Sequence, residues 1–138
     1  MADSWAAKYV GIPYVVGGDD ETGCDCWGLI NLVWRREKGS ELPTYDGRRF
    51  HSRKDRFAVY RGAVGHVGLF EPVPHGEERA FDGVLIRQDG LPTHCGIIVE
   101  PGKIMHTDKP TDVVIEPYPS LRFRGVDLLL GFYRPKTT

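Results

Sequence analysis

The sequence is poor in cysteine. Its 138 residues contain only three, and so small and odd a number does not suggest a disulfide framework. Cys24 and Cys26 are too close in the chain to form a disulfide bond without strain. We therefore expect three free thiols.

Long apolar runs are also missing. No stretch approaches the ~20 consecutive apolar residues of a membrane-spanning helix. The first residues, from Met1 to Trp5, lack the basic segment and the apolar core of a secretory signal. The sequence thus predicts a protein without a membrane span that is made in the cytoplasm. If it acts elsewhere, another component must carry it there.

Neither sign of charge is in excess. The 18 basic and 19 acidic residues give a net charge of −1, which argues against a general binder of nucleic acids or anionic membranes. The segment between Arg48 and Arg61 is locally basic, and either a solvated helix face or a surface for acidic groups would explain it. Hydrophobic residues make up 41% and charged residues 27%, as in a soluble globular protein. We expect one domain over residues 1–138.

Hydrophobic periodicity predicts helices in the first half of the chain and strands in the second. The predicted helices cover residues 5–10 and 26–38, with a further one after Ser52. The residues around Pro72 and Pro74 are predicted to form a loop. The predicted strands are residues 80–87, 93–99, 103–107, 112–116 and 127–134. Helices followed by a meander of roughly five antiparallel strands is the α+β pattern.

The clearest helix signal begins at Cys26. Asp25 is a good N-cap residue, and Gly39 is a good C-terminal stop. Cys26 is therefore expected in the first helical turn, where free backbone N–H groups and the helix dipole favour a thiolate. The alternative for a lone cysteine is an inert, buried side chain. Four apolar residues follow Cys26 at helical spacing: Leu29, Ile30, Val33 and Trp34.

Two histidines on neighbouring predicted strands could act on this thiol. Alternation puts His94 and Gly96 on one face of their strand and Cys95 on the other, and Gly96 leaves space for a helix end to approach. A hairpin that turns at Pro101-Gly102, with its midpoint near residue 100, would set His106 opposite His94, with Cβ atoms about 4.5–5.5 Å apart. The two imidazoles could then hydrogen-bond. A thiol, a histidine base and a group that orients the base form an activated nucleophile.

Four short motifs occur in order along nearly the whole chain: Pro13-Tyr14 with Gly17-Gly18, Asp25-Cys26-x-Gly28-Leu29, His94-x-Gly96-Ile97, and Gly102-Lys103-x-x-His106. This order resembles the NlpC family of papain-like cell-wall peptidases. The resemblance implies a papain-like fold in which N-terminal helices pack on the antiparallel sheet. It also implies that Cys26 is the nucleophile, His94 the base and His106 the third catalytic residue.

The same resemblance implies a substrate and its contacts. The family cleaves stem peptides of peptidoglycan, often between D-glutamate and diaminopimelate, and uses no metal or other cofactor. Tyr14 would lie beside the thiol and assist the oxyanion site together with the backbone N–H of Cys26. Asp25 and Trp27 are expected on the oxyanion and substrate side of the site. For Trp27 the simplest interpretation is a core aromatic, and the alternative is that it lines the cleft. Many members have serine where this chain has Trp27, which affects the expected shape of the cleft.

The run Gly23-Cys24-Asp25-Cys26-x-Gly28-Leu29 with Val33-Trp34-Arg35 resembles the phage-tail and gene-transfer-agent branch of the family. This implies tail proteins as partners and action in the periplasm or cell wall, for local wall penetration. Two alternatives are a non-catalytic structural component of the tail tip and an acyltransferase. A zinc site is not expected, because His94 and Cys95 point to opposite strand faces and the spacing fits no standard zinc motif.

Overall fold

The computed structural model describes residues 5–40, 70–88, 91–107, 111–118, 122–123, 126–127 and 129–135. The helix predicted after Ser52 and the basic segment between Arg48 and Arg61 lie outside these residues. The description therefore covers the central helix, both histidines and the predicted strands that surround them.

The first half of the described chain is built around one helix. A short 3-10 helix, η2 (Ala7–Tyr9), replaces the longer helix predicted over residues 5–10. Strands β1 (Asp19–Asp20) and β2 (Gly23–Cys24) form a small hairpin where a loop was predicted. Helix α1 (Cys26–Val33) continues as a π-helical segment, η3 (Trp34–Lys38), which ends at Gly39 with a left-handed φ of 65°. The prediction of a helix over residues 26–38 is thus confirmed.

The second half forms an antiparallel sheet in the order β3-β10-β4-β5-β6-β7. Strands β8 (Arg122–Phe123) and β9 (Val126–Asp127) pair separately. The five predicted strands correspond to β4 to β7 and β10, which confirms the α+β class. The bounds in the main sheet are β3 Phe70–Val73, β4 Gly83–Gln88, β5 Leu91–Glu100, β6 Lys103–His106, β7 Val114–Pro117 and β10 Leu129–Pro135.

Two features of the sheet differ from the prediction. Strand β3 was not predicted, because Pro72 lies within it and proline argues against a strand. Proline is tolerated at this position because β3 is an edge strand, which pairs only with β10 among the described strands. The sheet is also not a simple meander, because β10 crosses back to pair with β4 instead of β7.

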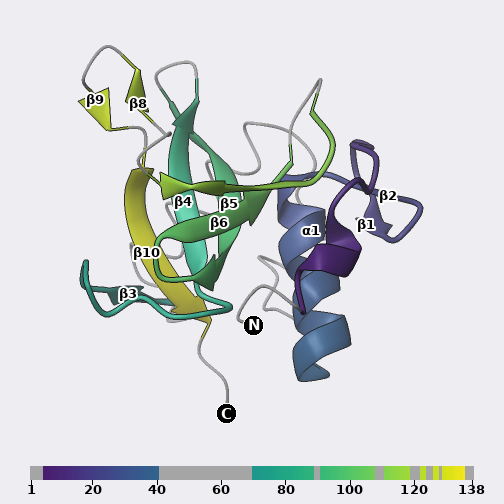
Figure 1. Ribbon diagram of the computed structural model, residues 1–138, viewed down its shortest axis with the longest axis horizontal. Coiled ribbons are helices and arrows are strands. Elements are labelled where there is room, and N and C mark those ends of the chain that lie inside the picture. Colours follow the sequence, from purple (N-terminus) through teal and green to yellow (C-terminus); the bar gives the residue numbers. More distant parts are fainter. Residues whose placement is uncertain are drawn as a thin grey trace.

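Helix α1 lies alongside the sheet and packs against β5 (Figure 1). Ile97 and Val99 of β5 join the apolar cluster that contains Leu29 and Val33 of the helix. Ile98 belongs to a second apolar cluster, with Val84, Ile104 and Phe132. The predicted alternation along β5 is therefore confirmed. Each fully buried aliphatic side chain of this kind contributes roughly 1.5–3 kcal/mol to folding.

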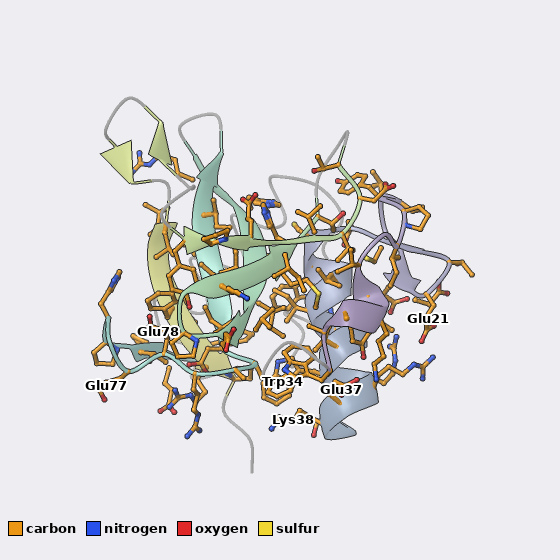
Figure 2. All side chains as sticks on the ribbon, viewed as in Figure 1. Glu21, Trp34, Glu37, Lys38, Glu77 and Glu78 are labelled. Carbon is orange, nitrogen blue, oxygen red and sulfur yellow. The ribbon has the colours of Figure 1, made fainter. Side chains whose placement is uncertain are left out.

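The C-terminal end of the helical segment is fastened to the start of β4. Trp34 donates its indole N–H to the carbonyl oxygen of Phe81 over 3.1 Å, and Lys38 Nζ lies 4.4 Å from the centre of the Phe81 ring. Glu37 accepts a 2.7 Å hydrogen bond from the hydroxyl of Tyr9. Figure 2 shows Trp34, Glu37 and Lys38 together at this end of the helix.

Among the described residues, no helix has the length and apolar character needed to cross a membrane.

Candidate active site

The start of α1 is held by the carboxylate of Asp25. One oxygen accepts a 2.7 Å hydrogen bond from the N–H of Gly28, and the other accepts a 2.9 Å bond from the N–H of Gly17. The first bond is a helix N-cap, as predicted. The second ties the preceding loop to the helix. Asp25 is 1% exposed, so these contacts give it a structural task, and its predicted contact with substrate stays a prediction.

Cys26 occupies the first position of α1 and is 2% exposed. Cys24 and Trp27 belong to the apolar cluster between helix and sheet, whereas Cys26 is in neither apolar cluster of the described residues. None of the three cysteines forms a disulfide bond. Burial, and next the nearby charge of Asp25, raise the pKa of the Cys24 thiol to about 12. Cys24 is thus an inert core thiol, whereas Cys26 is the first residue of α1.

Tyr14 is held in an extended segment between the helix start and the sheet. It forms a parallel bridge with Cys24, and its backbone N–H donates to the Asp112 carboxylate over 3.1 Å. The same segment exchanges backbone hydrogen bonds with Val113, whose N–H donates to Ile12. Tyr14 therefore lies next to the segment that leads into α1, and its predicted place beside the thiol stays a prediction. Asp112, which anchors it, was not predicted as a site residue.

His94, His106 and Glu116 form a chain of side chains across three neighbouring strands. Nε2 of His94 lies 2.9 Å from Nδ1 of His106, and Nε2 of His106 lies 3.0 Å from Oε1 of Glu116. His94 is 5% exposed. The predicted contact between the two imidazoles is therefore present. These two hydrogen bonds can fix both rings in place. They use Nε2 of His94, so Nδ1 of His94 is the ring nitrogen that takes no part in them.

The register between β5 and β6 differs from the prediction. Ile97 pairs with Met105, and continuing this register sets His106 opposite Gly96, two residues from His94. The turn is Pro101-Gly102, with Glu100 opposite Lys103 and φ of 99° at Gly102, so its centre lies beyond residue 100.

Gly96 makes room for a neighbouring histidine. A Cβ atom there would lie 3.1 Å from the Cβ of His106 and 3.0 Å from the carbonyl oxygen of Met105. The space predicted for a helix end is thus occupied by β6 and His106. Without a side chain at Gly96, the His106 ring can pass over this position and reach His94 diagonally.

Trp27 packs as a core aromatic. It belongs to the same apolar cluster as Leu29, and its ring meets that of Phe70 edge to face with centroids 5.9 Å apart. Its indole nitrogen is buried and has no hydrogen-bond partner among the described residues. Its predicted place beside the substrate stays a prediction.

Glu116 is the site residue that sequence reasoning missed. It ends a predicted strand, but a lone glutamate on a strand has no spacing that connects it to a histidine. Only the pairing of β6 with β7 brings it to His106. Within the described ranges, no group of three or more His, Cys, Asp or Glu side chains is arranged to hold a metal ion.

Comparison with known proteins identifies the family. Among curated proteins, the chain is 26% identical over 129 residues to the murein DD-endopeptidase MepS/murein LD-carboxypeptidase of Escherichia coli K12, and the match covers 91% of this chain. The chain spans 60% of that protein's length.

Two solved structures show the same fold. The NlpC/p60 domain of the peptidoglycan hydrolase SagA superposes with a TM-score of 0.60 at 21% identity, over 99% of both chains. RipD of Mycobacterium tuberculosis, described as a non-catalytic NlpC/p60 domain protein adapted to peptidoglycan binding, gives a TM-score of 0.58 at 16% identity, over 96% of this chain and 95% of RipD. The sequence profile of the NlpC/P60 family matches residues 11–124, a range that includes Cys26 and both histidines of the site. The chain belongs to the NlpC/P60 family.

Proposed function

We propose that this chain is a cysteine endopeptidase that cleaves the stem peptide of peptidoglycan. The observation that carries the proposal is the hydrogen-bonded chain of side chains from His94 through His106 to Glu116, in which His94 is buried. Cys26 lies at the first position of α1, and this helix packs against the strand that carries His94. A thiol nucleophile needs an oriented base, and the hydrogen-bonded imidazole pair can supply one.

The proposed mechanism uses Nδ1 of His94, the ring nitrogen that is not hydrogen-bonded to His106. Nδ1 of His94 takes the proton of the Cys26 thiol, and the sulfur attacks the carbonyl carbon of the scissile amide. The C–N bond breaks as His94 passes the proton to the departing amine, which leaves a thioester on Cys26. Water, activated by His94, then attacks the thioester, and the sulfur leaves with a proton. The backbone N–H of Cys26 and the side chain of Tyr14 are proposed to stabilise the oxyanion.

Two alternatives share this fold. RipD is described as non-catalytic and adapted to peptidoglycan binding, and an acyltransferase would pass the same thioester to an acceptor other than water. The hydrogen-bonded imidazole pair favours a catalytic protein over a purely binding one. An acyltransferase would release a new amide or ester product instead of a free carboxylate.

The biological setting is a separate proposal. The motif from Gly23 to Leu29 with Val33-Trp34-Arg35 resembles phage-tail and gene-transfer-agent members, so we propose that a tail or tail-like particle carries the domain to the cell wall. This setting is supported by the sequence resemblance and is independent of the chemistry at Cys26.

The function is tested on purified peptidoglycan. We expect the protein to release soluble stem peptides with new carboxylate ends, to keep its activity in excess chelator and to lose it after alkylation with iodoacetamide. Mass spectrometry of the soluble products gives the bond that is cut. Binding to peptidoglycan without release would support the RipD-like alternative. Activity lost in chelator and restored only by added metal would contradict the thiol mechanism.

The role of His106 is tested by its replacement. In His106→Asn the side-chain oxygen lies near the former Nδ1 and can accept a hydrogen bond from His94, so we expect measurable turnover of a synthetic stem peptide. His106→Ala has no acceptor and should lose roughly 10²-fold or more, within the range of general acid–base effects. Circular dichroism serves as the folding control. Wild-type turnover in His106→Ala would remove this residue from the site.

A further inference from the structure

Glu116 lies at the outer end of the imidazole chain. Its carboxylate is 3.0 Å from Nε2 of His106, and its side chain is 35% exposed. It lies on β7 opposite Ile104, one strand beyond His106 and two strands beyond His94. The contact is an ion pair only when His106 is protonated, and the Glu116 carboxylate remains in reach of water. Pairs with solvent-exposed charges usually contribute only about 0–1 kcal/mol to stability, so stability alone gives little reason for a glutamate here.

The chemistry of the acceptor decides where the protons of both rings lie. An ionised carboxylate only accepts hydrogen bonds, so Nε2 of His106 must carry the proton that it donates to Glu116. A neutral His106 then has its lone pair at Nδ1. The 2.9 Å contact with His94 must therefore be donated by Nε2–H of His94. This leaves the lone pair of a neutral His94 on Nδ1.

The opposite arrangement would disable the base. Without the carboxylate, His106 can carry its proton on Nδ1 and donate it to Nε2 of His94. A neutral His94 would then be protonated on Nδ1, and that nitrogen could not accept the proton of a thiol. The two tautomers of His106 thus correspond to a competent and an incompetent His94.

We propose that Glu116 is a positioning residue that sets the direction of the hydrogen bonds in the His94–His106 pair and so keeps Nδ1 of His94 basic. The inference rests on the proposed function of Cys26 and His94. Glu116 acts through His106. Its negative charge also favours the imidazolium that forms on His94 when the thiol is deprotonated.

Two variants of similar length separate this role from a surface ion pair. Glu116→Gln keeps a side-chain oxygen that can accept from His106, although it can also present its N–H₂. Glu116→Met keeps the length and removes the acceptor. Glu100→Met is the matched control, because Glu100 forms a 3.5 Å ion pair with Lys103 on the neighbouring hairpin and is 33% exposed. That control loses a comparable surface pair without touching either imidazole.

The first measurement is the ring tautomer of His94, read from ¹⁵N chemical shifts of histidine-labelled protein at a pH where both rings are neutral. We expect the Nε2–H form in the wild type, in Glu100→Met and predominantly in Glu116→Gln, and a mixture with the Nδ1–H form in Glu116→Met. This measurement needs no turnover, so it remains valid if the protein proves not to be a peptidase. An unchanged His94 tautomer in Glu116→Met would overturn the inference.

The second measurement is turnover of a stem peptide. We expect Glu116→Met to lower kcat by about 10-fold to 100-fold with KM nearly unchanged, a smaller loss than removal of a general base. Glu116→Gln should retain more of kcat than Glu116→Met, and Glu100→Met should match the wild type. A rise in KM without a fall in kcat would instead make Glu116 a substrate contact and overturn the positioning role.

Discussion

Replacing Cys26 with alanine is expected to lower the release of stem peptides by at least about 10⁴-fold, because loss of a nucleophile removes the covalent route altogether. The alanine removes one sulfur atom from the first turn of α1 and leaves the Asp25 cap intact, so the fold should persist. His94→Asn should be equally inactive, since an amide cannot take the thiol proton. Turnover of a synthetic stem peptide, with circular dichroism for folding, measures both variants.

Cys24→Ala is the control for this result. Cys24 is fully buried two residues from Cys26, and burial raises the pKa of its thiol to about 12, so it stays protonated and unreactive near neutral pH. Alanine is preferred to serine, because a buried hydroxyl would need a hydrogen-bond partner. Near wild-type turnover is expected. An inactive Cys24→Ala variant beside an active Cys26→Ala variant would reverse the assignment of the nucleophile.

Replacing Gly28 with alanine is expected to cause the largest loss of stability. A Cβ atom at this position would approach the carbonyl oxygen of Gly18 and lie 2.9 Å from the carbon of the same carbonyl. Alanine in a helix normally gains up to about 1 kcal/mol over glycine. The clash is with backbone, and overpacking typically costs about 1–3 kcal/mol, so the clash should outweigh the gain. Urea unfolding should show a net loss of up to about 2 kcal/mol.

The matched control is Gly83→Ala. The nearest atom to a Cβ at Gly83 is the carbonyl oxygen of Tyr133 at 3.4 Å, an ordinary contact. The stability of this variant should lie within about 0.5 kcal/mol of the wild type, as for most substitutions that meet no special feature. Equal stability of the two alanine variants would mean that the loop at Gly18 can move away from the helix at little cost.

The helix could be predicted from the sequence because its signals are local. The Asp25 cap, the spacing of apolar residues and the Gly39 stop all lie within one segment, and the structure has each of them. The contact between His94 and His106 was also predicted correctly. The turn at Pro101-Gly102 was predicted as well, but the register was wrong by two residues. The midpoint was placed near residue 100, and the bulge between Ile98 and Glu100 is not visible in a symmetric count.

Features that depend on distant segments could not be predicted. Glu116 reaches His106 only because β6 and β7 pair, and Asp112 reaches Tyr14 across 98 residues of chain. Proline in β3 concealed an edge strand, because whether proline is tolerated depends on which neighbours the strand has. In each case the deciding information is a partner in space, which no spacing in the sequence specifies.

The hydrogen bond between the Tyr14 backbone N–H and the Asp112 carboxylate has a consequence for how the protein folds during its synthesis on the ribosome. Closing a loop of 98 residues costs about 4 kcal/mol of chain entropy, so this contact can form only with the support of the packed sheet. Domains fold as units during synthesis, and β6, β7 and β10 are all made late. The segment that carries Cys26 therefore leaves the ribosome well before the strands that carry His94 and His106. The nascent chain carries an unassembled site until most of its length has emerged.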